Sequence, residues 1–261
     1  MNRQTFPIKL PVLLALTFLF GASGAWAQLS APYLPPTLAQ AAERAHQLFE
    51  DSRQHWLSQT NNAESACEFG HACFDWAEFA AKASQRVAIA REGIAACRCA
   101  AKLKPQLVAA HYYLAMNFGR IAETRPLGVL KLVRDMESEF KTAADLDPTF
   151  DYAGPWRSLG ELYLDAPGPP FSIGNHVKAR DYLTKAVALR PDYPGNQIAL
   201  LEVCLKLGDR NTVILRLDDA ERVLHEAHEQ LTGVEWIQFW QDWDIRWDKL
   251  KRRTGVVAAK R

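Results

Sequence analysis

Apolar side chains along this chain recur mainly at spacings of three and four residues, which places them on one face of an α-helix. No segment shows the two-residue alternation that a half-buried strand requires. The spacing predicts helices at residues 37–60, 74–102, 106–123, 127–146, 154–165, 176–189, 195–208, 212–231 and 234–253. We therefore expect an all-α protein.

Three of these helices close with similar residues at an even spacing. Their closing prolines, Pro105, Pro148 and Pro191, are 43 residues apart. Because proline cannot continue a helix, each one marks the end of the second helix of a pair. A fixed period of this size predicts a stack of helix pairs, that is, a helical-repeat solenoid.

One repeat has a specific signature. Residues 156–163 read W-R-S-L-G-E-L-Y, which matches the W-x2-L-G-x2-Y pattern of the first tetratricopeptide helix. We expect small residues to let the two helices approach closely while bulky residues fill the space around the contact. The predicted packing residues are Trp156, Leu159, Gly160 and Tyr163 in the first helix and Ala179, Leu183, Ala186 and Pro191 in the second. The sequence thus resembles the tetratricopeptide-repeat family.

The loops are longer than that family requires. Its standard repeat has about 34 residues, and most of the excess falls between the two helices of a pair. The excess lies at residues 123–128 and 165–174, which are rich in proline or glycine. We expect loops that project from the stack there.

The N-terminus has the order of a secretory signal peptide: Arg3 and Lys9, an apolar stretch at residues 10–20, and the small-residue triplet at 25–27. A membrane anchor is disfavoured because the apolar stretch is shorter than the roughly 20 residues that span a bilayer. We predict a cleaved signal peptide at 1–27 and a soluble, periplasmic or secreted protein. The leader and first helix then occupy 28–74, the repeats 75–232 and a Trp-rich capping helix 233–261.

The repeat register predicts which side chains line the concave groove. If the signature residues face the partner helix, Arg157, Glu161 and Leu164 face the groove. The 43-residue period adds Leu114, Phe118 and Ile121 from the preceding first helix and Leu200 from the following one. The expected groove is apolar except in its middle repeat. It binds a small apolar ligand or a partner, or another helix of the same chain fills it.

The final helix carries Trp236, Trp240, Trp243 and Trp247 in one stripe, spaced 4, 3 and 4. We expect the stripe to cover the last repeat, since solenoid ends need capping. The alternative is self-association into a homo-oligomer.

Charge and cysteines narrow the function. With 31 basic and 30 acidic residues, the chain offers no dedicated basic face for nucleic acid. Cys67 and Cys73 flank a turn-prone segment in the exported part, so we expect a disulfide between them. A metal site that includes His71 matches no zinc spacing, and we predict no metal.

Catalytic patterns are also missing from the sequence. The chain has neither a G-x-S-x-G nor a phosphate-loop motif. His225 and His228 share a helix face, but no acid or cysteine completes a recognised site with them. We predict no catalytic residues and no cofactor, and a hydrolase or metalloenzyme stays a remote alternative.

A second resemblance rests on residues 112–120, 159–163 and 174–180 and on Pro191-Asp192-Tyr193. Over roughly residues 106–205, the chain is similar to the T-component proteins of tripartite ATP-independent periplasmic (TRAP) transporters. The resemblance implies a helical, periplasmic, oligomeric protein whose partner is the transporter's substrate-binding protein, although the lipid-attachment cysteine common in that group is missing. We expect a binding scaffold accessory to such a transporter, with a homo-oligomeric assembly subunit as the alternative.

Overall fold

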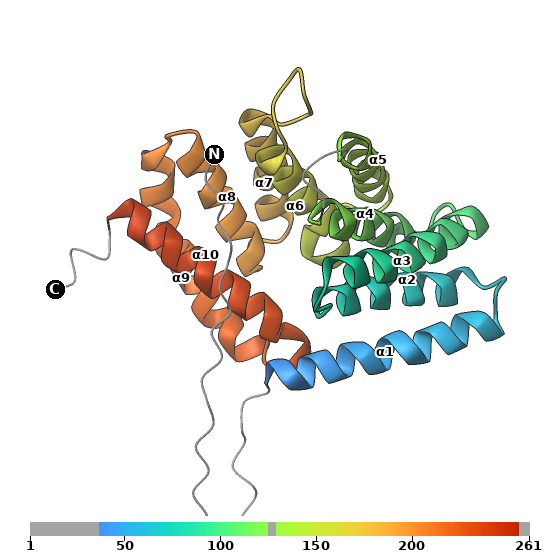
Figure 1. The fold of residues 1–261 in the computed structure, drawn as a ribbon. Coiled ribbons are helices and arrows are strands. Elements are labelled where there is room, and N and C mark those ends of the chain that lie inside the picture. The colour runs from blue at the N-terminus through green and yellow to red at the C-terminus, as the bar shows by residue number, and fades with distance from the viewer. Residues whose placement is uncertain (1–36, 125–128, 256–261) are drawn as a thin grey trace, which may run out of the picture. The chain divides into compact units, whose positions relative to one another are not determined.

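The computed structural model describes residues 37–124 and 129–255, and the described part is helical without any strand. The predicted signal peptide and most of the leader lie outside these residues. The elements are α1 (Leu38–Ser58), α2 (Ala63–Glu78), α3 (Ala83–Leu103), α4 (Val108–Ala122), α5 (Leu130–Leu146), α6 (Phe150–Asp165), α7 (His176–Leu189), α8 (Pro194–Lys206), α9 (Arg210–Gln230), the 3-10 turn η1 (Val234–Trp236) and α10 (Ile237–Thr254) (Figure 1). The predicted all-α fold is confirmed.

The helices pack as four successive pairs, α2 with α3, α4 with α5, α6 with α7 and α8 with α9 (Figure 1). The first helices of the pairs, α2, α4, α6 and α8, each contact the next first helix along the stack. This neighbour-to-neighbour packing is the defining property of a solenoid, in which each repeat buries its apolar face on the adjacent one.

Glycine marks the closest helix contacts. A Cβ atom added at Gly160 would lie 2.4 Å from Cγ of Leu183 and 3.2 Å from the carbonyl oxygen of Ala179. Of the other predicted packing residues, Leu159, Tyr163 and Ala186 are buried, Trp156 is half-buried and stacked on Tyr182, and Pro191 is exposed beyond the end of α7.

Residues 63–78 form a helix, although the sequence predicts a helix only from residue 74 and a turn-prone loop before it. Asn62 caps α2 by accepting a hydrogen bond from the backbone N–H of Ser65 at 3.0 Å. Gly70, which had suggested a turn, instead permits a close contact, because a Cβ there would lie 2.2 Å from Sγ of Cys97. The helix pairs therefore begin at Ala63, before the predicted boundary at residue 75, and the predicted helix 74–102 is divided by a break at residues 79–82.

The predicted disulfide between Cys67 and Cys73 is wrong. Both residues are buried free thiols on α2. Six residues of helix separate their Cα atoms by about 9 Å along the axis, whereas a disulfide requires less than about 7 Å. The expectation failed because it assumed a flexible loop between them.

Candidate functional site

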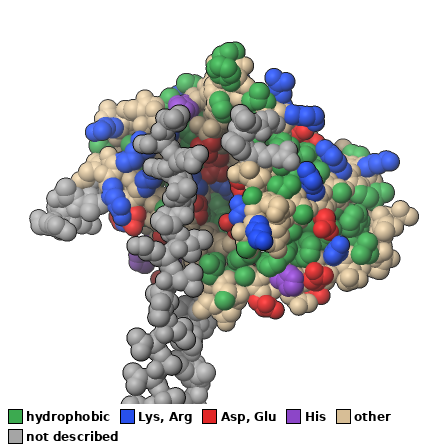
Figure 2. Space-filling model, viewed as in Figure 1, with side chains coloured by type: hydrophobic (Ala, Val, Ile, Leu, Met, Phe, Trp, Pro, Cys, Tyr) green, Lys and Arg blue, Asp and Glu red, His purple; other side chains and the backbone are tan. Residues whose placement is uncertain are grey.

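The solenoid contains a pocket with a volume of about 660 Å³. One wall consists of side chains from the first helices α2, α4, α6 and α8. The opposite wall consists of side chains from α1, η1 and α10. These elements also pack together, since α1 contacts both η1 and α10. Figure 2 shows a hollow on this face of the molecule, with acidic side chains visible inside it.

Aromatic rings form much of the wall. Tyr152 and Tyr193 stack with their ring centroids 4.5 Å apart, and Trp236 meets both rings edge-on, at 5.8 and 6.5 Å. On the other side of the pocket, Tyr113 stacks on the imidazole of His71 at 3.8 Å. Offset-stacked and edge-to-face pairs of this kind are the preferred arrangements of aromatic rings, so the contacts between the rings favour these orientations.

The backbone at the start of α6 is distorted, and the distorted segment includes Asp151 and Tyr152, which both line the pocket. Asp151, Tyr152 and Ala153 have positive φ angles of 48°, 56° and 61°. The left-handed conformation costs an L-residue roughly 1–2 kcal/mol, so surrounding contacts must hold it in place. Asp151 supplies such contacts: its Oδ2 accepts a hydrogen bond from the Tyr112 hydroxyl at 2.7 Å and from Arg157 at 3.4 Å.

Arg157 contacts several of the residues around the pocket. Its guanidinium is buried, donates to Oδ1 of Asn196 at 3.2 Å and lies over the ring of Tyr193 at 4.8 Å. It also donates to the backbone carbonyl of Tyr152 at 3.3 Å. Arg157 therefore links α6 to α8 and fixes the kinked segment.

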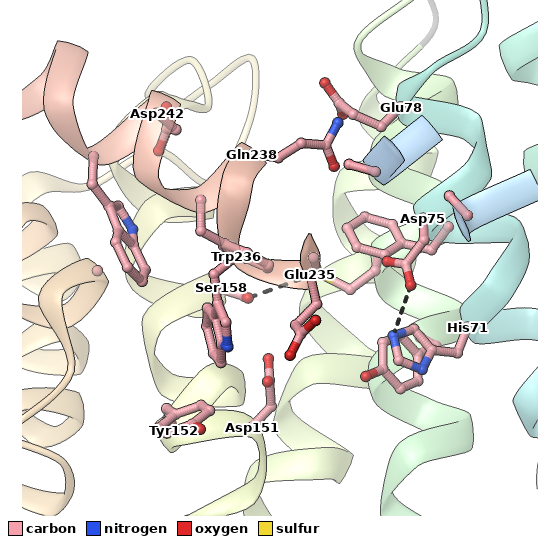
Figure 3. Close-up of a pocket in the computed structure, with 18 of the residues that line it drawn as sticks. His71, Asp75, Glu78, Asp151, Tyr152, Ser158, Glu235, Trp236, Gln238 and Asp242 are labelled. Carbon is pink, nitrogen blue, oxygen red and sulfur yellow. Dashed lines mark hydrogen bonds and ion pairs between the residues drawn. The ribbon is translucent and has the colours of Figure 1, made fainter. Parts of the chain in front are cut away.

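His71 and Asp75 lie one turn apart on α2 and form an ion pair at 3.2 Å (Figure 3). Burial raises the pKa of Asp75 above its usual value, while the neighbouring charges of His71 and Arg120 oppose that rise. Asp151 adds to the rise, so the negative charges of α2 and α6 act on each other across the pocket.

Two further arginines belong to carboxylate clusters. Arg246 of α10 contacts Glu161 at 3.1 Å, Glu202 at 2.7 Å and Asp242 at 3.2 Å. These pairs connect the last helix to α6 and α8. Arg120 of α4 pairs with Glu78 of α2 and lies over the ring of Phe74, with 4.2 Å to its centroid.

Of the predicted groove residues, only Arg157 and Glu161 line the pocket. Leu114, Phe118 and Ile121 are instead buried in a core cluster with side chains of α3. Leu200 is buried, and Leu164 half-buried, in the core around α8. The prediction that these five leucine, isoleucine and phenylalanine side chains line the groove is therefore wrong.

The α4 positions that face the pocket differ from those that the 43-residue period predicts. The 43-residue period makes Asn117 the equivalent of Gly160, but an asparagine cannot provide the same close contact. The Asn117 side chain donates instead to the carbonyl of Gly70 on α2 at 2.8 Å. The α4 residues that line the pocket are Tyr112, Tyr113, Met116 and Arg120.

The repeat pattern does not indicate the pocket residues that come from α1, α2 and the C-terminal segment. Among them are Arg44, His71, Asp75, Glu235 and Asp242. The tryptophan stripe in the sequence did indicate part of this lining, since Trp236 and Trp243 line the pocket. Trp243 and Trp247 are buried in the core cluster around α8. The stripe therefore packs within its own chain, and α10 covers part of the groove.

Other site types find no support within residues 37–124 and 129–255. No three His, Cys, Asp or Glu side chains gather there as a candidate metal site. None of the described helices combines the length and the apolarity needed to cross a membrane.

Comparisons with known proteins identify the type of fold. No family model and no curated protein sequence matches this chain. Similar solved structures include the thermophilic TPR protein TTC0263 of Thermus thermophilus (16% identity, 81% of this chain and 93% of that chain, TM-score 0.55), MamA (13%, 75% and 99%, 0.51) and the APC/C hetero-tetramer Cut9-Hcn1 (18%, 83% and 35%, 0.54). The chain therefore has a tetratricopeptide-like helical-repeat fold.

Proposed function

We propose that this chain is an exported binding scaffold that holds a small organic ligand in the pocket between its first helices and α10. The observation that carries the proposal is the pocket itself. Its volume of about 660 Å³ falls in the range of small-molecule sites, which is about 300–1,000 Å³. It also combines aromatic walls with convergent polar groups, as such sites do.

The arrangement of α1 and α10 favours a compact ligand over an extended peptide. An open solenoid offers a long concave surface, but here α10 packs on α8 and α1 reaches across to η1. What is left is a short cleft, lined from two sides and open to the surface. This supports a revision of the expected ligand, from an apolar molecule in an open groove to a mixed polar and aromatic one in a pocket.

We further propose that the scaffold passes its ligand to or from a partner protein, the substrate-binding protein of a TRAP-type transporter. The support is local: the segment at residues 112–120, which carries the resemblance to T-components, supplies Tyr112, Tyr113, Met116 and Arg120 to the pocket. Copurification of the tagged chain with such a binding protein from the periplasm tests this step. Export itself is tested by N-terminal sequencing, which should begin at Gln28.

Native mass spectrometry after gentle purification tests the binding function. We expect a bound molecule of a few hundred daltons in the unmodified protein. Ser158 lines the pocket, so Ser158→Trp should fill it and abolish the adduct. Ser138→Trp is the matched control, because Ser138 is exposed on α5. If the unmodified protein carries no ligand, or if both variants keep it, this pocket is not a ligand site.

A further inference from the structure

The charges around the pocket are unbalanced toward the acidic side. Its lining includes six carboxylates, Asp75, Glu78, Asp151, Glu161, Glu235 and Asp242, against four arginines, Arg44, Arg120, Arg157 and Arg246, and the imidazole of His71. Two more carboxylates, Glu123 and Glu202, contact these arginines from outside the lining. When one sign of charge is in excess around a cleft, the low-dielectric walls focus the electrostatic potential into it. Such a cleft attracts ligands of the opposite charge.

The four arginines are already engaged. Arg44 pairs with Glu235, Arg120 with Glu78 and Arg157 with Asp151. Arg246 contacts three carboxylates at once. An anionic ligand would therefore have to displace a protein carboxylate from its arginine, and the released carboxylate would then face the ligand.

The carboxylates of Asp75 and Asp151 are less completely neutralised. Asp75 pairs with the imidazole of His71 alone, and Asp151 is 3.4 Å from its arginine. Glu235 and Asp151 come from η1 and α6 and point toward one another in the pocket, with Asp75 on the neighbouring wall (Figure 3). These groups form an acidic centre among aromatic rings.

The aromatic walls suit a cation as well. The protein's own guanidinium groups cover one face of three lining rings: Arg120 over Phe74 at 4.2 Å, Arg157 over Tyr193 at 4.8 Å and Arg190 over Tyr152 at 4.5 Å. A ligand's cation is therefore left with the indole of Trp236. The faces of such rings attract cations, most strongly at tryptophan. Trp236 adds its indole beside Tyr152 and Tyr193.

We infer that the pocket selects an organic cation, an ammonium group carried on an aromatic or aliphatic body. The inference rests on the proposed binding function and names the ligand class for that same pocket. The ammonium lies among Asp75, Asp151 and Glu235, and the body of the ligand lies against the indole of Trp236 and the edges of the Tyr113 and Tyr152 rings.

Titration calorimetry with three indoles of similar size tests this selection: tryptamine (cationic), tryptophol (neutral) and indole-3-acetate (anionic), at pH 7. Tryptamine should bind at least tenfold more tightly than tryptophol, and indole-3-acetate should bind most weakly. Asp75→Asn keeps the side chain's shape but removes its charge, so it should weaken tryptamine about tenfold and leave tryptophol unchanged. Asp219→Asn is the control, since Asp219 is exposed on α9.

The outcomes separate the ligand class from the function. Tighter binding of indole-3-acetate than of tryptamine overturns the cation inference but leaves the pocket as a binding site. Equal losses in Asp75→Asn and Asp219→Asn also overturn it, because the preference would then follow overall charge and not the acidic centre. If none of the three probes binds, the cation inference fails, and the native mass spectrum decides separately whether the pocket holds another class of ligand.

Discussion

Arg44 on α1 forms an ion pair with Glu235 in η1, although the two residues are 191 positions apart in the chain. The pair joins the first and the last part of the described fold, at the edge of the pocket. It helps to give the concave side of the solenoid a second wall. The contact is half-exposed, so its role is to position the two segments rather than to stabilise the whole fold.

Arg44→Ala should loosen this closure without unfolding the protein. Surface ion pairs contribute less than about 1 kcal/mol, so we expect a small change in the free energy of unfolding. Hydrogen exchange should become faster at residues 38–48 and 234–239. Arg222→Ala removes a similarly exposed ion pair on α9 and should leave exchange in both segments unchanged. Unaltered exchange in the Arg44 variant would mean that other contacts close the pocket.

Gly160→Ala should destabilise the stack by about 1–3 kcal/mol, because the added Cβ would overpack the contact with Leu183. Gly119→Ala is the matched comparison on α4, where the new Cβ would meet only the flexible end of Met136, at 3.4 Å. That change should be neutral or should stabilise by up to about 1 kcal/mol, since alanine favours helix. Urea denaturation measures both, and equal effects would contradict the assigned contact.

Phe118→Asp should unfold the protein or cost more than about 3 kcal/mol, because Phe118 is buried between α3 and α4 and an aspartate there would lack a partner. Leu215→Asp on α9 is the control, since Leu215 is 80% exposed. Thermal denaturation followed by circular dichroism compares the two. A folded Phe118→Asp variant with an unchanged melting temperature would place this side chain outside the core.

Stability should fall as the pH rises through neutrality because of His111. Its Nδ1 lies 2.7 Å from Glu139 and its Nε2 lies 2.9 Å from the carbonyl oxygen of Pro105. Both partners only accept hydrogen bonds, so the imidazolium satisfies both contacts. The hydrogen bond with Glu139, followed by that with Pro105, raises the pKa of His111 in the folded state despite partial burial.

A raised histidine pKa contributes stability below the unfolded value of about 6.5, and that stability is lost as the pH rises through the folded pKa. His111→Gln should therefore flatten the profile of unfolding free energy against pH above 6. His225→Gln, at an exposed position on α9, serves as the control. The prediction fails if the two variants have the same pH profile.

The cysteines should be unpaired and should differ in reactivity. Burial raises the pKa of Cys67 to about 12 and also raises the pKa of Cys73, Cys97 and Cys204, which suppresses the reactive thiolate. Cys99 is only half-buried. In native protein at pH 8, Ellman's reagent should label Cys99 fast and the other four only after denaturation. Peptide mapping without reduction should show no bridge between Cys67 and Cys73.

Local sequence signals were enough for most of the helices and for the repeat. Proline spacing, apolar periodicity and the signature around Gly160 all act within one helix pair, so they could be recognised without the rest of the chain. The exception was residues 61–73, where Gly70 suggested a turn. A glycine has the same appearance in a sequence whether it bends the backbone or admits Cys97 of another helix, and only the packing separates the two.

The pocket was decided by tertiary structure. The 43-residue period predicted Leu114 and Phe118 in a groove, but both are buried against α3. Asn117 on the same helix donates a hydrogen bond to Gly70 on α2, a contact that crosses between repeats. The pairing of Arg44 with Glu235 joins the two ends of the fold, and no spacing within a helix encodes it. The sequence by itself determined that helices form and stack, because those preferences are local. Which side chains meet in the pocket depended on packing between helices that are far apart in the sequence, because no local preference encodes those contacts.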